Sequence, residues 1–153
     1  MCGLAGSWEP RGERDQDELK RIARDMARLV ESRGPDDAGE WAEPGAGIAL
    51  GHRRLSIVDL SPRGRQPMVS ASGALVIVYN GEIYNFRELR AELEAAGASF
   101  RGDSDTEVLL EACAAWGIER ALGRCIGMFA VVLWDRTLRR LHLVRDRLGI
   151  KPL

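Results

Sequence analysis

The sequence predicts a domain of mixed α+β class, and three features of the chain support this prediction. Short segments rich in β-branched and apolar residues recur along the chain. Segments with the apolar spacing of an amphipathic helix separate them. The length of 153 residues fits one domain with its own hydrophobic core. We therefore expect a single domain over residues 1–153 that folds alone.

The first half of the chain predicts strands around one helix. Residues 3–8 form the first expected strand, and a helix is expected over residues 16–32, before the Gly34-Pro35 stop. Strands over residues 39–42 and 46–52 should form a hairpin with a Pro-Gly turn. The helix follows from apolar residues at helical spacing, namely Leu19, Ile22, Ala23, Met26, Leu29 and Val30.

The next expected strands cover residues 67–70 and 74–80. The second contains five apolar residues in succession, which is typical of a strand buried on both faces. We expect it to stop at Asn80-Gly81-Glu82. This stretch is compatible with a tight Asn-Gly hairpin turn. The dipeptide alone favours the turn, and the alternative is an oxyanion hole, in which the asparagine amide and the glycine N–H donate to one developing charge.

Two capping boxes predict the next helices. Asn85 with Glu88 should begin a helix that ends near residue 96, and Ser104 with Glu107 one that ends near residue 116. Asp105 lies in the first turn of the second helix, where the helix dipole favours a carboxylate. The remaining elements are a short helix over residues 118–122, a buried strand over 127–134 and its partner over 139–145.

Composition and charge exclude several classes of protein. The hydrophobic share is 45%, the charged share 29% and the net charge −1, so no global field attracts nucleic acid or an anionic membrane. No apolar run reaches the roughly 18 residues of a membrane span, and no secretory segment begins the chain. The three cysteines form no CxxC pair, so no metal site is expected. We expect a cytoplasmic protein that binds neither nucleic acid nor membrane.

Cys2 is the residue with the clearest chemical opportunity. Removal of Met1 would make it the N-terminal residue, and methionine is usually removed when the next residue is small. The α-amine, with a pKa near ~8, could then exchange a proton with the thiol, whose pKa is near ~8.5. The alternative is an ordinary buried apolar cysteine at the start of a strand.

Arg53 and Arg54 follow the second strand of the expected hairpin and precede a short apolar run. A single arginine at a strand end is commonly a solvated surface charge. Two arginines in this context suggest a guanidinium that holds a carboxylate with two hydrogen bonds.

Four separated stretches together resemble the glutamine amidotransferase domain of asparagine synthetases, a member of the N-terminal-nucleophile hydrolases. They are Cys2 to Gly6, Arg53 to Asp59, Tyr79 to Asn85 and Ser104 to Glu107. Further segments resemble the same family: Arg33 to Asp37, Gly127 to Ala130 and Arg145 to Gly149. The Arg-Leu-Ser-Ile-Val-Asp motif followed by Gln66-Pro67 resembles asparagine synthetases and their close relatives. It resembles the amidophosphoribosyl and glucosamine-phosphate branches of the family less.

The resemblance implies an αββα fold, in which two antiparallel sheets pack face to face between helical layers. It also implies a second, synthetase domain that binds ATP, magnesium and aspartate, and the 153 residues lack the Ser-Gly-Gly phosphate loop of such a domain. The last residues are apolar and no polar tail follows them, which is expected for a chain that is cut at a domain boundary. We therefore expect a glutaminase domain without a cofactor, with glutamine and a synthetase domain in cis or in trans as partners, and a homodimer as an option for a full-length form.

The resemblance assigns roles to individual residues. Cys2 would be the nucleophile, with Asn80 and Gly81 as the oxyanion hole. Arg54 would bind the α-carboxylate of glutamine, and Glu82 with Asp105 its α-ammonium. The backbone around Ile57 and Val58 would line the same pocket.

Two other classes of function remain open from the residues. The first is a hydrolase that pairs Cys2 with His52, which would work with Met1 in place. The second is a non-catalytic glutamine-binding or docking module. Within the resembling family, a relative that amidates a carboxylate other than aspartate could share this domain.

Overall fold

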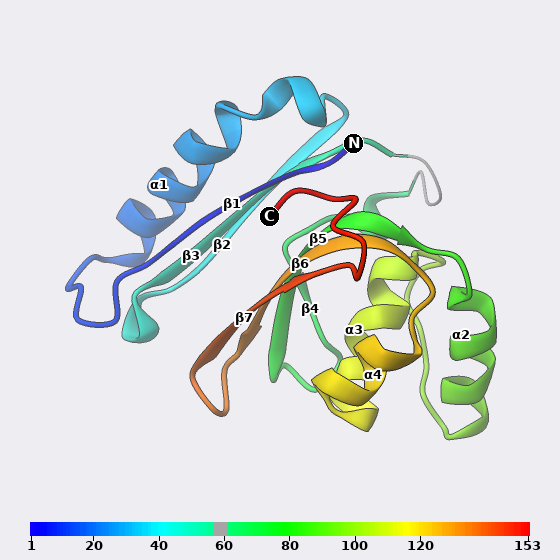
Figure 1. The fold of residues 1–153 in the computed structure, drawn as a ribbon. Coiled ribbons are helices and arrows are strands. Elements are labelled where there is room, and N and C mark those ends of the chain that lie inside the picture. The colour runs from blue at the N-terminus through cyan, green and yellow to red at the C-terminus, as the bar shows by residue number, and fades with distance from the viewer. Residues whose placement is uncertain (57–60) are drawn as a thin grey trace. The chain divides into compact units, whose positions relative to one another are not determined.

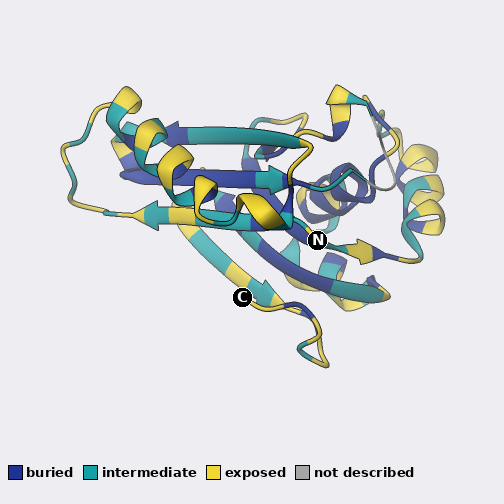
Figure 2. Cartoon of the chain, turned by 90° about the horizontal axis from the view of Figure 1, so that it is seen from above, coloured by how far each residue is buried: buried dark blue, intermediate teal, exposed yellow. Residues whose placement is uncertain are grey.

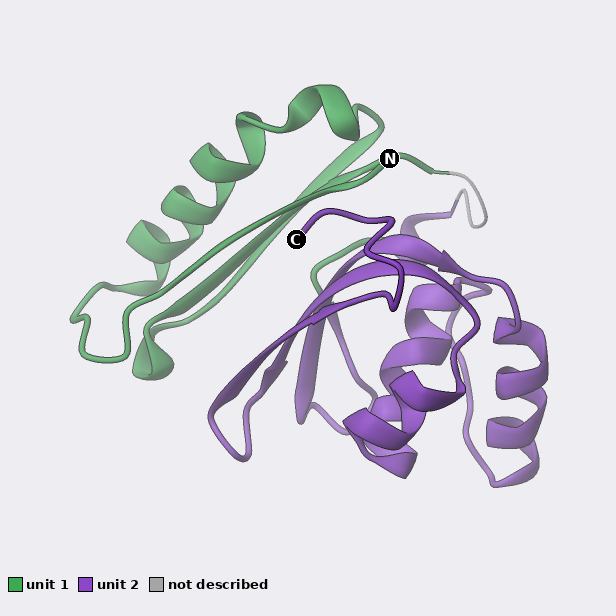
Figure 3. Cartoon of the chain, in the orientation of Figure 1, with its two compact units in different colours: residues 1–56, 65–67 green, residues 57–64, 68–153 purple. Residues whose placement is uncertain are grey.

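The computed structural model describes residues 1–56 and 61–153, and the chain divides into two compact units. The first unit comprises residues 1–56 and 65–67, and the second comprises residues 57–64 and 68–153 (Figure 3). Each unit contains one antiparallel sheet. Each sheet also has its own helices (Figure 1).

The first unit is a three-stranded sheet covered by one helix. Its strands are β1 (Gly3–Trp8), β2 (Asp37–Glu43) and β3 (Ile48–Arg54), in the order β1-β3-β2. Helix α1 (Gln16–Arg28) contacts all three strands. Its apolar face is buried, and most of the remaining surface is exposed or intermediate (Figure 2).

Helix α1 begins at a capped position and ends earlier than predicted. Asp15 accepts a hydrogen bond from the Glu18 N–H at 2.8 Å, which satisfies one of the free amides of the first turn. The helix ends at Arg28, and a short 3₁₀ turn follows at Glu31–Arg33. Leu29 is 85% exposed, so the apolar stripe that predicted a helix to residue 32 does not extend to it.

The predicted hairpin of the first unit is confirmed. A short 3₁₀ turn, Pro44–Ala46, joins β2 to β3, and Gly47 closes it with a positive φ of 66°. Strand β2 begins two residues before the predicted Gly39 and ends one residue after Ala42, and β3 begins and ends two residues later than predicted.

The second unit is a four-stranded sheet with helices over one face. Its order is β4-β5-β6-β7 and all neighbours are antiparallel. Helix α3 packs against β5, and α2 and α4 pack against α3 (Figure 1). The elements are β4 (Met68–Val69), β5 (Leu75–Ile83), α2 (Phe86–Ala95), α3 (Asp105–Trp116), α4 (Ile118–Arg124), β6 (Gly127–Asp135) and β7 (Arg140–Arg145). A short 3₁₀ turn, Pro62–Gly64, precedes β4.

Strand β5 does not stop at Asn80, so that prediction and the hairpin-turn interpretation are both wrong. Asn80 pairs with Ala130 and Gly81 with Phe129, and the strand continues to Ile83. A Cβ at Gly81 would lie 2.3 Å from the Met128 carbonyl oxygen, so glycine is needed here for close strand approach rather than for a turn.

The two predicted capping boxes have different outcomes. Ser104 caps α3 by accepting the Glu107 N–H at 3.2 Å, as predicted. The Glu107 carboxylate, however, accepts the backbone N–H groups of Arg101 and Gly102 at 2.9 and 2.8 Å. Asn85 precedes α2 without a side-chain cap, because its amide is engaged elsewhere.

The Asn85 side chain joins the end of β5 to the start of β6. Its Nδ2 donates to the Arg124 carbonyl at 3.0 Å, and its Oδ1 accepts the Ile126 N–H at 2.9 Å.

The α+β class with two antiparallel sheets is confirmed, while the face-to-face packing of those sheets stays a prediction. In the described part of the chain, no helix has the length and apolarity that crossing a membrane requires.

Candidate active site

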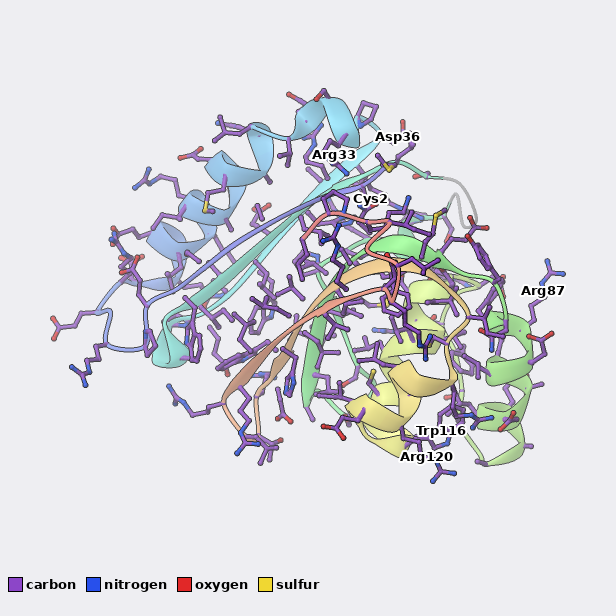
Figure 4. All side chains as sticks on the ribbon, in the orientation of Figure 1. Cys2, Arg33, Asp36, Arg87, Trp116 and Arg120 are labelled. Atoms are coloured by element: carbon purple, nitrogen blue, oxygen red, sulfur yellow. The ribbon has the colours of Figure 1, made fainter. Side chains whose placement is uncertain are left out.

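Cys2 lies immediately before β1 in the first unit and is partly exposed. Its Sγ donates toward the Leu55 carbonyl oxygen at 3.7 Å. Its own carbonyl oxygen accepts a hydrogen bond from Arg33 Nε at 3.1 Å, and the two residues lie side by side in Figure 4. The backbone of Cys2 is therefore held by a side chain from the turn after α1.

The segment from Arg33 to Asp37 is fastened to the end of β3. Gly34 approaches Arg53 so closely that a Cβ would lie 2.4 Å from the Arg53 carbonyl oxygen. Arg53 Nε donates to the Gly34 carbonyl at 3.0 Å. The Asp36 N–H donates to the Arg54 carbonyl at 3.0 Å, and its carboxylate accepts the Ser56 N–H at 2.7 Å. The Arg-Gly-Pro-Asp motif thus builds the surroundings of Cys2, a role that the sequence did not reveal.

Arg54 and His52 lie on β3 in the same unit as Cys2. Arg54 is 8% exposed and His52 is 1% exposed. His52 stands opposite Leu4 in the β1–β3 register. The hydrogen bond of the Cys2 thiol goes to the Leu55 carbonyl rather than to the imidazole, so this geometry does not support a Cys2–His52 pair.

The other two thiols are unsuited to nucleophilic chemistry. Burial raises the pKa of the Cys113 thiol to about 12 and that of the Cys125 thiol to about 11. Both side chains are buried in the core of the second unit, as predicted for Cys113. The protonated thiol is a poor nucleophile, so Cys2 is the cysteine available for chemistry.

The second unit holds the predicted oxyanion residues on β5. Side chains alternate along a strand, so Tyr79 and Ile83 face the helix-covered core while Asn80 and Glu82 lie on the other face. Asn80 is 4% exposed, and Glu82 is exposed. Gly81, between them, holds β5 close to β6 at Met128.

Asp105 lies at the N-terminus of α3 and reaches the end of β5. Its Oδ2 accepts the Tyr79 hydroxyl at 2.7 Å and the Ile83 N–H at 3.0 Å. Burial raises the pKa of the Asp105 carboxyl above its usual range, and the charge of Glu82 acts in the same direction. The hydrogen bonds from Ile83 and Tyr79 act in the opposite direction without cancelling the shift.

The predicted site residues therefore fall into two groups. Cys2 and Arg54 belong to the first unit, and Asn80, Gly81, Glu82 and Asp105 to the second. Ile57 and Val58, predicted to line the pocket, lie outside the described residues. Among the residues that the structure describes, no cluster of three His, Cys, Asp or Glu side chains could hold a metal ion.

Two antiparallel sheets with their helices, and a cysteine directly after Met1, agree with what the resemblance to a glutamine amidotransferase domain implies. The family model described as "Glutamine amidotransferase domain" matches residues 1–153, and the chain belongs to this family. The family prediction made from the four motifs is confirmed.

Several curated relatives are named asparagine synthetases. "Asparagine synthetase [glutamine-hydrolyzing] 2" of Bacillus subtilis is 41% identical over all of this chain and 20% of its own length. "Asparagine synthetase B [glutamine-hydrolyzing]" of Escherichia coli is 39% identical over all of this chain and 26% of its own length. The chain thus spans about a fifth to a quarter of the length of these curated relatives.

A solved structure shares the fold. The glutamine phosphoribosylpyrophosphate amidotransferase from B. subtilis superposes with a TM-score of 0.75 at 21% identity, over 97% of this chain and 38% of its own. At this level of identity the likeness concerns the fold alone.

Proposed function

We propose that the chain hydrolyses glutamine to glutamate and ammonia through a thioester at Cys2. The observation that carries the proposal is the environment of Cys2, which is the partly exposed thiol of the chain and has its carbonyl fixed by Arg33. The position of Cys2 after Met1 would give it an α-amine as its own base once the methionine is removed. Membership of the glutamine amidotransferase family supports the choice of substrate.

The reaction follows from the nucleophile. The Cys2 thiolate attacks the side-chain amide carbon of glutamine, and the carbonyl oxygen becomes an oxyanion. The Asn80 amide and the Gly81 N–H donate to this oxyanion, and one such donor is worth roughly 3 kcal/mol. Ammonia leaves with the proton that the α-amine relays, and a glutamyl thioester remains. Water then attacks the thioester, releases glutamate and returns the thiol.

Glutamine is recognised at its α-carbon in this proposal. Arg54 pairs with the α-carboxylate, because a guanidinium holds a carboxylate with two hydrogen bonds. Glu82 and Asp105 hold the α-ammonium, and Ile57 and Val58 contribute backbone to the same pocket. The buried Asp105 carboxylate and the neighbouring charge of Glu82 are suited to a cation.

The ammonia serves an ATP-dependent amidation in a synthetase domain, in cis or in trans. The two curated relatives described above support this, because they are named asparagine synthetases and have about four to five times the length of the aligned chain. The acceptor is then aspartate, activated with ATP and magnesium in that domain, and the domain described here needs no cofactor. A cytoplasmic location and a homodimer of the full-length form belong to the same proposal.

Replacement of Cys2 tests the glutaminase proposal. Cys2→Ala should abolish glutamate release while the circular dichroism spectrum stays that of the parent. Cys113→Ala is the matched control and should keep activity, because its thiol is buried in the core. Glutamate production by Cys2→Ala at the parent rate would refute the nucleophile. Glutamine binding without turnover by the parent would instead favour a docking module.

A second experiment tests the division of labour. Addition of ATP, magnesium and aspartate to these 153 residues should change neither glutamate output nor the products. ATP-dependent appearance of asparagine from this chain would contradict the assignment of amide synthesis to a separate domain.

Mass spectrometry of the N-terminus should show loss of Met1 in active protein, and full activity with Met1 retained would exclude the α-amine of Cys2 as the base.

A further inference from the structure

Tyr79 is a buried residue whose hydroxyl lies against a predicted substrate ligand. It is 3% exposed on β5, and its hydroxyl donates to Asp105 Oδ2 at 2.7 Å. Burial, followed by the charge of Asp105, raises the pKa of Tyr79, so the hydroxyl stays protonated and remains a donor. The contact links the strand of the predicted oxyanion hole to the N-terminus of α3.

Two of the hydrogen bonds that Asp105 accepts go to one oxygen of the carboxylate, and the Thr106 N–H is a third donor to the same group. The Tyr79 hydroxyl and the Ile83 N–H both go to Oδ2. A carboxylate oxygen accepts about two hydrogen bonds, so Oδ2 is filled and a further donor must approach Oδ1. Burial of a carboxylate is costly unless donors compensate it, and these two donors also set the plane of the group.

A purely structural role would not require the phenol. The N-terminus of α3 is already capped by Ser104, and the Ile83 N–H alone would join Asp105 to β5. The ring of Tyr79 already fills the core of the second unit, a task that phenylalanine would perform equally well. What the hydroxyl adds is the orientation of Asp105 and a further donor to its charged form, beside the N–H groups of Ile83 and Thr106.

We propose that Tyr79 is a positioning residue for substrate recognition, whose hydroxyl orients the Asp105 carboxylate so that Oδ1 receives the α-ammonium of glutamine. The inference rests on the proposed function of Asp105 and deepens it. Tyr79 touches no reacting atom, so its loss should affect binding of glutamine rather than the chemical step.

The ionisation of Asp105 gives the proposal a distinctive pH dependence. The groups that act on the Asp105 carboxylate by charge or hydrogen bonding are Tyr79 and Glu82 on β5 and Cys125 after α4. The Thr106 N–H on its own helix is a further hydrogen-bond donor. Loss of the Tyr79 hydrogen bond should raise the pKa of Asp105 further, because that bond favours the charged form. The acidic limb of the kcat/KM profile should then move to higher pH.

Tyr79→Phe tests the inference, with Tyr84→Phe as the matched control. The chain has two tyrosines, and Tyr84 is 57% exposed. Tyr79→Phe should raise KM for glutamine about tenfold with kcat near the parent value, since a hydrogen bond to a charged group is lost. Tyr84→Phe should match the parent. Inhibition by glutaramate, which is glutamine without its α-amino group, should be the same for the parent and both variants.

The outcomes separate this inference from the proposed function. An inactive parent that does not bind glutamine would refute the proposed function. An active parent whose KM and acidic limb are unchanged in Tyr79→Phe would refute the positioning role alone. An equal loss of glutamine and glutaramate binding would also refute it, because the effect would then not concern the ammonium.

A second measurement covers the case in which Tyr79→Phe fails to fold. In the Tyr84→Phe background, 3-fluorotyrosine can replace the remaining tyrosine with almost no change in shape. The fluorinated phenol is a stronger donor, so the acidic limb should move to lower pH. If the acidic limb of the kcat/KM profile were unchanged in the folded fluorinated protein, the proposal would be overturned.

Discussion

The Asp146 carboxylate accepts the backbone N–H of Phe129 at 3.2 Å, and so joins the segment after β7 to strand β6. The same side chain accepts the N–H groups of Leu148, Ile150 and Lys151 at 3.2, 2.9 and 3.0 Å. One carboxylate therefore organises the turn at the end of the described chain. These contacts explain the buried position of Asp146, which is 6% exposed.

Asp146 should make the stability of the second unit sensitive to acid. Burial alone would raise its pKa, but the four backbone N–H groups prevail and lower it to about 2. The ordinary value is about 3.9, so the stabilisation is complete above about pH 4 and is lost as the pH falls through about 2. Asp146→Asn should therefore lower the urea midpoint at pH 7, and the difference from the parent should shrink below about pH 4.

Asp135→Asn is the control for this prediction, because Asp135 accepts the Leu138 N–H in an exposed turn. It should change the midpoint little at either pH. A difference between Asp146→Asn and the parent that is the same at pH 7 and near pH 2 would show that the charge of Asp146 does not contribute.

Gly81 should not tolerate a side chain. An added Cβ would lie 2.3 Å from the Met128 carbonyl oxygen and 2.7 Å from the Phe129 Cα, and both are backbone atoms of the paired strand. Gly81→Ala should therefore cost about 1–3 kcal/mol of unfolding free energy, as overpacking does, and should lower activity by moving the strand of the proposed oxyanion hole. Chemical denaturation and glutaminase assays check the two effects.

Gly123→Ala is the matched control in the same unit. Gly123 lies in α4, and apart from its chain neighbours and the backbone of its own helix, no atom of the described residues lies within 4 Å of the position of its added Cβ. Alanine should stabilise this helix by about 0.5–1 kcal/mol. If both variants had the same stability as the parent, the close approach of β5 and β6 at Gly81 would be in error.

The sequence predicts well those elements whose signal is local. The apolar spacing of Leu19, Ala23 and Met26 fixes the position of α1, and alternating or continuous apolar runs fix the strands. The Ser104 cap is also local, since donor and acceptor lie three residues apart. These features need no knowledge of distant partners.

Distant partners decide the elements that the sequence predicts wrongly. Asn80-Gly81 has the composition of a turn, but pairing with Ala130 and Phe129 some fifty residues later keeps it in a strand. Asn85 has the composition of a helix cap, yet the Ile126 N–H, 41 residues away, takes its side-chain oxygen. In both cases a long-range contact overrides a local preference.

For the candidate site, the sequence predicts which residues take part, and these roles stay a prediction, but it does not predict the contacts that hold those residues. The motifs name Cys2, Asn80 and Asp105, and the family match supports the resemblance behind them. The bond from Tyr79 to Asp105 spans 26 residues and the bond from Arg33 to Cys2 spans 31. Neither partner could be deduced from spacing, because each depends on how a strand or turn folds back in its unit.

The kinetics of two variants should separate the roles proposed for Asn80 and Arg54. The Asn80 amide would meet a charge that exists mainly in the transition state, so Asn80→Ala should lower kcat about a hundredfold with little change in KM. Arg54 would meet the α-carboxylate in the ground state and the transition state alike. Arg54→Ala should therefore raise KM about tenfold or more with a smaller effect on kcat.

Arg21→Ala is the surface control for this pair of variants. Arg21 is exposed on α1, where it contacts Asp25 one helical turn away, and its loss should leave both parameters unchanged. Circular dichroism and denaturation should show all three variants folded before rates are compared. If Asn80→Ala and Arg54→Ala both lowered kcat and raised KM to the same extent, the two residues would be structural. Asn80 would then serve only the buried strand β5, and Arg54 only the packing at the end of β3.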